Sequence, residues 1–117
     1  MSNREYPFNP KGQTVLVTGA TSAPTGVQVA LATDNNAGQY DCYVLHNSGS
    51  NLAFIGWGKD ATTAQNNAVV PTAGTPTDTV ILPAGVTAIL RFSKDLFFSA
   101  ATTAATSDIY ITPGEGL

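Results

Sequence analysis

Short runs of β-prone residues, separated by turn residues, recur along almost the whole chain. In several of them apolar and polar residues alternate, which places every second side chain on one face, as in a half-buried β-strand. The clearest examples are residues 26–31 (GVQVAL), 86–92 (VTAILRF) and 107–112 (SDIYIT). No apolar stripe with the period of about 3.6 residues per helical turn is sustained anywhere. The alternation therefore predicts an all-β protein.

The other runs predicted as strands are residues 13–18, 40–46, 52–57, 79–82 and 96–99. About eight short strands in one small domain favour two packed sheets, so we predict a jelly-roll-like antiparallel β-sandwich. Residues 47–51 (NSGSN) have turn chemistry, which predicts a hairpin between the runs 40–46 and 52–57. Residues 60–78 are too long for a simple turn and are predicted to form a crossing loop or an arm.

Residues 13–117 are predicted to form the single sandwich domain, and residues 1–12 an extended N-terminal arm. The arm contains Tyr6-Pro7-Phe8-Asn9-Pro10, in which two prolines disfavour a helix or a central strand. The aromatic side chains of Tyr6 and Phe8 favour docking over disorder. The arm can dock on its own sandwich or on a neighbouring subunit, and the sequence favours neither.

The composition is poor in charge, with 11% charged residues against about 25% in typical soluble domains. Small uncharged residues take their place, including 16 Thr and 16 Ala. The net charge of −3 and the scattered basic residues argue against nucleic acid as a partner. No apolar run approaches the length of about 18 residues that a membrane helix needs. Because the start is polar and the chain has one cysteine, we expect assembly in a cytoplasm.

One segment is similar to a cofactor loop. Residues 14–26 (TVLVTGATSAPTG) resemble the dinucleotide-binding loop of short-chain dehydrogenases. However, Ala23 and Pro24 stand where that family has a glycine and an apolar residue, and Gly26 falls one position late. The next residues alternate like a strand and not like a helix, so we interpret the segment as a turn between strands.

The other chemically reactive residues also lack partners in the sequence. His46 is the only histidine and Cys42 the only cysteine, which is too few for a zinc site. We therefore interpret His46 as a structural or surface residue and Cys42 as a small buried thiol on a strand. No spacing of carboxylates selects a catalytic or a calcium-binding group. The sequence predicts no enzyme, no cofactor and no metal.

The candidate partner-binding residues are the aromatic and apolar side chains at loops, strand ends and chain ends: Tyr6, Phe8, Trp57, Val69, Val70 and Leu117. Trp57 lies between two glycines near a strand end, where it is either part of the core or exposed as an interface residue or a sugar-stacking platform.

Four features of the chain together resemble a known class of proteins. They are the aromatic–proline arm, residues 82–85 (LPAG) leading into a strand, the Ala/Thr-rich loop 100–106, and the ending 109–116 (IYITPGEG). The pattern resembles the small β-sandwich virion proteins of tailed bacteriophages, in particular head decoration or cement proteins. It covers most of the chain as a pattern and only residues 109–116 as a motif.

The resemblance implies a homodimer or homotrimer on the outer capsid surface of the virion, where it would bridge and stabilise neighbouring copies of the major capsid protein. One alternative is a tail knob, tail fibre or head-fibre subunit that contacts the host. An alternative of another class is a carbohydrate-binding module in which Trp57 and Tyr40 or Tyr43 stack on sugar.

Overall fold

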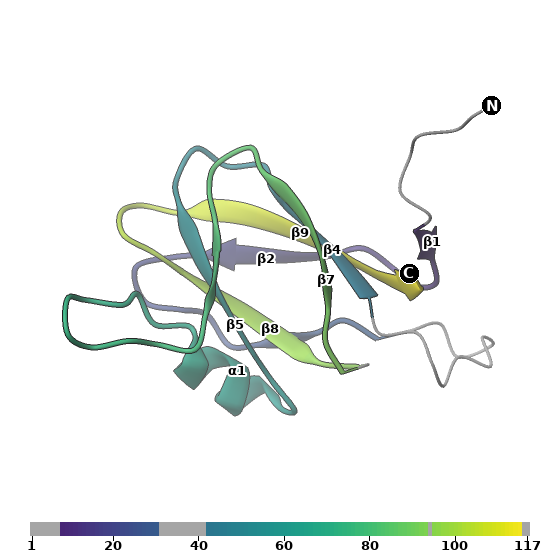
Figure 1. The fold of residues 1–117 in the computed structure, drawn as a ribbon, viewed down its shortest axis with the longest axis horizontal. Helices are drawn as coiled ribbons and strands as arrows, with labels where there is room; N and C mark the ends of the chain where they lie inside the picture. Colours follow the sequence, from purple (N-terminus) through teal and green to yellow (C-terminus); the bar gives the residue numbers. More distant parts are fainter. Residues whose placement is uncertain (1–7, 31–41, 94, 116–117) are drawn as a thin grey trace.

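A computed structural model describes residues 8–30, 42–93 and 95–115 as two antiparallel sheets and one short helix (Figure 1). The strands of the first sheet are β1 (Asn9–Pro10), β2 (Val15–Gly19), β4 (Cys42–Asn47), β7 (Thr87–Arg91) and β9 (Ser107–Glu115). The strands of the second sheet are β3 (Val27–Gln28), β5 (Ala53–Gly58), β6 (Val80–Leu82) and β8 (Phe97–Thr102). The helix is α1 (Ala61–Asn67).

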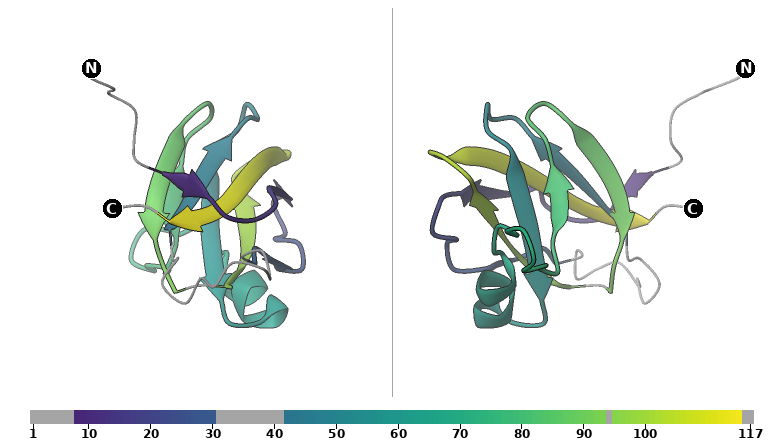
Figure 2. Two further views of the ribbon diagram at one scale, coloured as in Figure 1. Left: turned by 90° about the vertical axis from the view of Figure 1, so that its right-hand side faces the viewer. Right: turned by 60° about the vertical axis from the view of Figure 1, so that its left-hand side comes forward.

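The strand order is that of a jelly roll. The first sheet runs β1–β9–β4–β7, and β2 pairs with β9 on the same side as β1, while the second sheet runs β3–β8–β5–β6. Along the chain the strands pass from one sheet to the other at every step except β1 to β2 and β5 to β6. This double winding of antiparallel strands is the jelly-roll arrangement, and it confirms the predicted all-β sandwich. Figure 2 shows the two layers from two further sides.

Alternate residues of each strand fill the space between the two sheets. Leu45, Ile109 and Ile111 from the first sheet are buried against Ile55 and Phe98 from the second. Burying an aliphatic or aromatic side chain of this size contributes about 1.5–3 kcal/mol. The strands are short, so their stability comes mainly from this shared core.

The predicted hairpin between residues 40–46 and 52–57 is wrong. β4 pairs with β7 and β9, whereas β5 pairs with β6 and β8, so the intervening turn carries the chain from one sheet to the other. The physical reason lies in Asn47, whose buried Nδ2 donates hydrogen bonds to the carbonyl oxygens of Asn51 (2.9 Å) and Leu82 (2.8 Å). These bonds tie the end of β4 to the end of β6 in the opposite sheet.

A second corner lies directly beside the first. The chain turns tightly after β6, where the Val86 N–H donates to the Pro83 carbonyl at 3.1 Å. Gly85 adopts φ of +77°, a conformation that glycine takes without steric cost. Its N–H donates to the backbone carbonyl of Asn47 at 2.8 Å. Both corners are therefore held together at Asn47.

Residues 60–78 were expected to be irregular, and this prediction is wrong for the first half. Asp60 is the N-cap of α1, and its carboxylate accepts a hydrogen bond of 2.8 Å from the Thr63 N–H. The remaining connection to β6 is irregular, as predicted, and projects from the sandwich as a narrow loop closed by a bridge between Thr72 and Thr75 (Figure 1).

Glycines on neighbouring segments let α1 lie directly on the second sheet. A Cβ at Gly58 would lie 2.8 Å from the Cβ of Thr63, and a Cβ at Gly26 would lie 2.8 Å from the carbonyl oxygen of Ala61. The buried Ala64 completes this contact. The helix thus covers the outer face of the second sheet, as Figures 1 and 2 show, whereas no described helix covers the outer face of the first.

The described part of the N-terminal arm docks on its own chain. Asn9 and Pro10 pair with the end of β9, and the Lys11 N–H donates to the Pro113 carbonyl at 2.9 Å. Pro10 is tolerated there because β1 lies at the edge of the sheet. Tyr6 lies outside the described residues, so the destination of residues 1–7 stays a prediction.

Candidate functional site

The two reactive side chains that the sequence singled out, Cys42 and His46, both lie on β4. Among the residues that the structure describes, no group of three or more His, Cys, Asp and Glu side chains could hold a metal ion. The Nδ1 atom of His46 lies 2.6 Å from the hydroxyl oxygen of Thr87 on the next strand. Cys42 is a buried free thiol, which confirms its interpretation. Within the described ranges, no helix is long and apolar enough to cross a membrane.

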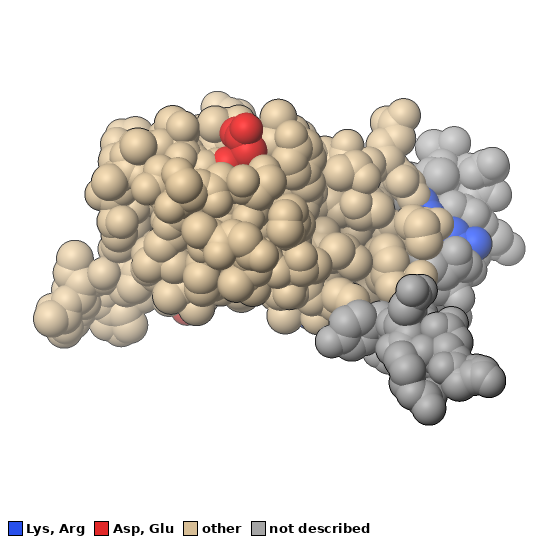
Figure 3. Space-filling model, turned by 90° about the horizontal axis from the view of Figure 1, so that it is seen from above, with Lys and Arg blue, Asp and Glu red and all other residues tan. Residues whose placement is uncertain are grey.

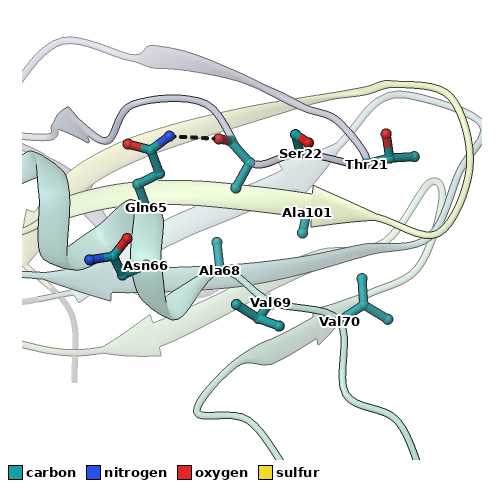
Figure 4. A pocket seen from close by; sticks show the side chains of 9 residues that line it. Thr21, Ser22, Gln65, Asn66, Ala68, Val69, Val70 and Ala101 are labelled. Carbon is teal, nitrogen blue, oxygen red and sulfur yellow. Dashed lines mark hydrogen bonds between the residues drawn. The ribbon is translucent and has the colours of Figure 1, made fainter.

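A shallow groove brings the predicted interface residues Val69 and Val70 together (Figure 4). It has a volume of about 510 Å³ and lies between the end of α1 and the segment that follows β2. Thr21 and Ser22 lie along one side, and Asn66 and the two valines along the other. Val69 is 47% exposed. We call this feature the Val69 groove.

Hydrogen bonds hold the two sides of the Val69 groove in place. The Gln65 side chain donates from Nε2 to the Ala23 carbonyl oxygen at 3.0 Å, which joins α1 to the segment after β2. The Ser99 hydroxyl donates to the Pro24 carbonyl oxygen at 2.6 Å, which joins the same segment to β8. These two bonds hold the segment after β2 against both α1 and β8.

The residues that line the Val69 groove carry no charge. Valine and alanine side chains alternate with the hydroxyls of Thr21 and Ser22 and the amides of Gln65 and Asn66. Amides and hydroxyls can donate to and accept from a peptide backbone, while the valines offer apolar contact. The chemistry suits an uncharged polypeptide segment.

Trp57 lies in a separate groove on another side of α1. This second groove, of about 460 Å³, is also lined by Lys59, Asp60 and Asn67. The indole ring packs on the ring of Phe92 at a centroid distance of 4.9 Å, so Trp57 is half-buried and anchored in the core. The sequence is compatible with either a core position or an exposed position for Trp57. In the structure one part of its side chain packs in the core and another part is exposed.

The electrostatics of the Trp57 groove are those of a helix cap. The hydrogen bonds from the backbone N–H of Thr63 and from its hydroxyl hold the pKa of Asp60 below its ordinary value of 3.8. The Asn67 side chain donates to the Trp57 carbonyl oxygen at 2.9 Å. Both polar groups thus have structural partners that account for their positions.

The structure does not gather all the predicted interface residues into one site. Val69 and Val70 share a groove, Trp57 lies in another, and Phe8 is half-buried just before β1. Tyr6 and Leu117 lie outside the described residues.

The predicted role of Tyr43 in sugar stacking is corrected. Tyr43 is buried, and its hydroxyl donates to the Ser93 carbonyl oxygen at 2.7 Å, so its ring faces the core and not the solvent. The other tyrosine of that prediction, Tyr40, lies outside the described residues.

The sequence analysis missed the polar half of the Val69 groove, namely Thr21, Ser22, Gln65 and Asn66. The available signal was Asp60, an N-cap type of residue followed by ten residues without Gly or Pro. With the helix recognised, Gln65 and Asn66 would fall in its last turn, next to the two valines.

Comparisons of the chain with protein-family models, with curated proteins and with solved structures find no match.

Proposed function

We propose that the chain is a capsid decoration (cement) protein that binds the outer surface of a phage head and bridges neighbouring major capsid subunits as a homo-oligomer. The jelly roll supports this by fold-level analogy, since viral capsid proteins use that fold. Lectin domains use it too, so the fold alone does not select between the two classes. The observation that carries the proposal is the uncharged Val69 groove, whose hydroxyls, amides and valines suit contact with a polypeptide.

The described surface supports binding to protein over large areas of weak contact. Few of the described residues are charged, and Figure 3 shows one face of the molecule as a broad area of uncharged side chains. Contacts of this kind need little desolvation of charge, although each one contributes little affinity. Many copies on one shell act together, so weak single contacts suffice for stable decoration.

The experiment compares the binding of variants to empty capsids of the phage that encodes the chain. Val69→Asp places a charge in the Val69 groove and is expected to weaken binding about tenfold or more. Val86→Asp is the matched control, because Val86 is also an exposed valine but lies at the corner after β6. Both variants should keep the unfolding temperature of the wild type. Equal binding of the two variants would remove the groove from the proposal.

A carbohydrate-binding module is the second candidate, and the Trp57 groove favours it. A half-buried tryptophan beside Lys59 and Asn67 offers an apolar ring next to polar groups, as sugar sites do. Trp57 is the only tryptophan, so its fluorescence reports directly on this groove. We expect no change in emission when host polysaccharide is added. A saturable change, or binding to host cells without binding to capsids, would favour a carbohydrate-binding or host-contacting fibre protein instead.

A further inference from the structure

The outer face of the first sheet exposes a row of side chains that crosses four strands. The register places Leu16 of β2 beside Tyr110 of β9, Tyr110 beside His46 of β4, and His46 beside Thr87 of β7. Leu16 is 45% exposed and Tyr110 is 41% exposed, although both lie in the middle of regular strands. We call this surface the open face.

Polar side chains of the open face bond to one another across neighbouring strands. The pairs are Thr18 with Asp108 (2.9 Å), Thr14 with Thr112 (2.7 Å) and His46 with Thr87 (2.6 Å). Because each of these groups has a partner within the face, covering the face leaves few polar atoms unsatisfied. The bonds also fix the side chains, so less conformational entropy is lost on docking.

The charges of the open face lie near opposite corners. Among the residues of β2, β4 and β7 and residues 107–114 of β9, only Asp108 and Arg91 belong to charged residue types. Asp108 pairs with Thr18 at one end of the strands, and Arg91 pairs with Cys42 at the other end. The acidic residue lies toward β2, and the basic residue lies on the opposite edge strand.

We propose that the open face binds a second copy of this chain in a two-fold, face-to-face contact. A two-fold axis that lies between the faces and runs oblique to the strands exchanges the two charged corners. Each Arg91 then lies opposite Asp108 of the second copy, and the contact occurs twice, as in any isologous interface. The same operation places the apolar rings of the two Tyr110 residues near the centre. The charge pattern is thus complementary to itself, which argues for a second copy over an unrelated partner.

The size of the open face predicts a weak dimer. Four strands about 4.8 Å apart and on average about six residues long give roughly 400 Å² of projected area per copy. A stable interface buries about 800 Å² per partner. The pairing is therefore expected at high concentration, or where copies are held side by side on a surface. The face-to-face pairing rests on the homo-oligomer of the proposed function. Its test needs no capsid, so a failure of the pairing is distinguishable from a failure of the decoration function.

Sedimentation velocity on the full chain, over a range from micromolar to millimolar concentration, tests the pairing. The wild type should shift from monomer to dimer as its concentration rises. In a dimer of Arg91→Asp, or of Asp108→Arg, residues 91 and 108 carry charges of the same sign at both contacts. Each variant should therefore dimerise about tenfold more weakly than the wild type, or worse. An equimolar mixture of the two variants should form a heterodimer, because both contacts are then between opposite charges.

Ile81→Asp is the control, because Ile81 is 55% exposed but lies on the second sheet, and it should dimerise like the wild type. Circular dichroism establishes that all variants are folded. A wild type that stays monomeric at millimolar concentration would overturn the proposal. So would a trimer, single charge variants that associate like the wild type, or a mixture that stays monomeric.

Discussion

The hydroxyl of Ser107 donates a hydrogen bond of 2.6 Å to the side-chain oxygen of Asn47, and both residues are buried. The same oxygen accepts from the Gly49 N–H at 3.0 Å, while the Asn47 amide nitrogen donates to two carbonyl oxygens. One side chain therefore joins the start of β9 and both corners between the sheets. In a sandwich of short strands, this polar contact fixes which strand ends meet.

Replacing Asn47 tests that role. Asn47→Ala removes four hydrogen bonds and leaves buried groups, such as the Leu82 carbonyl, without their partner. We expect a loss of about 3 kcal/mol in the free energy of unfolding, measured by urea denaturation. Asn66→Ala is the matched control on an exposed asparagine and should change stability by less than about 0.5 kcal/mol. Equal effects of the two variants would contradict the role of Asn47.

The contact between α1 and the second sheet predicts a steric effect at Gly58. Gly58→Ala adds a Cβ that would lie 2.8 Å from the Cβ of Thr63, so the helix must shift. Overpacking of this kind costs about 1–3 kcal/mol. Amide hydrogen exchange in α1 should accelerate by more than exchange in β9.

Gly74→Ala provides the comparison for Gly58. A Cβ at Gly74 meets no atom within 4 Å, but the residue has φ of +82°. The substitution should cost about 1 kcal/mol from backbone strain alone and leave exchange in α1 unchanged. Faster exchange in α1 for Gly74→Ala as well would show that the effect at Gly58 is not steric.

The cap of α1 predicts a dependence on pH. Hydrogen bonds from Thr63 lower the pKa of Asp60 in the folded chain below 3.8. The carboxylate therefore stabilises the folded state above its ordinary pKa, and this stabilisation is lost as the pH falls through the lowered folded pKa. Carboxyl ¹³C titration should give Asp60 a pKa below that of an unstructured aspartate. Thr63→Pro removes the donating N–H and should raise it, whereas an unchanged pKa would contradict the cap.

The local pattern of the sequence predicts most of the strands because alternation is a local property. Residues 107–112 alternate between buried and outward side chains, as β9 does in the structure. The corner at residues 47–51 is different. A turn rich in Asn, Ser and Gly suits a hairpin and a change of sheet equally well, and the choice depends on Leu82, which is distant in the sequence. Local chemistry therefore predicts the turn but not its partners.

The helix and the open face escaped prediction because their causes are not local. α1 has only seven residues, contains Thr and Asn, and has no apolar stripe. Its intrinsic helix propensity is therefore low. It is stabilised by the space that Gly26 and Gly58 leave for it. Likewise, Leu16 and Tyr110 become neighbours only through the register of β2 and β9, which the sequence does not reveal. Val69 and Val70 could be singled out from the sequence because they stand out within their own segment, and both line the Val69 groove.

The most direct test of the decoration function is the number of copies that an empty capsid takes up at saturation, measured by cryo-electron microscopy together with the temperature at which the capsid bursts. A decoration protein should occupy equivalent positions on the shell in a fixed number and raise the bursting temperature. Capsids that take up no ordered copies, or burst at the same temperature with and without the protein, would contradict the proposed function.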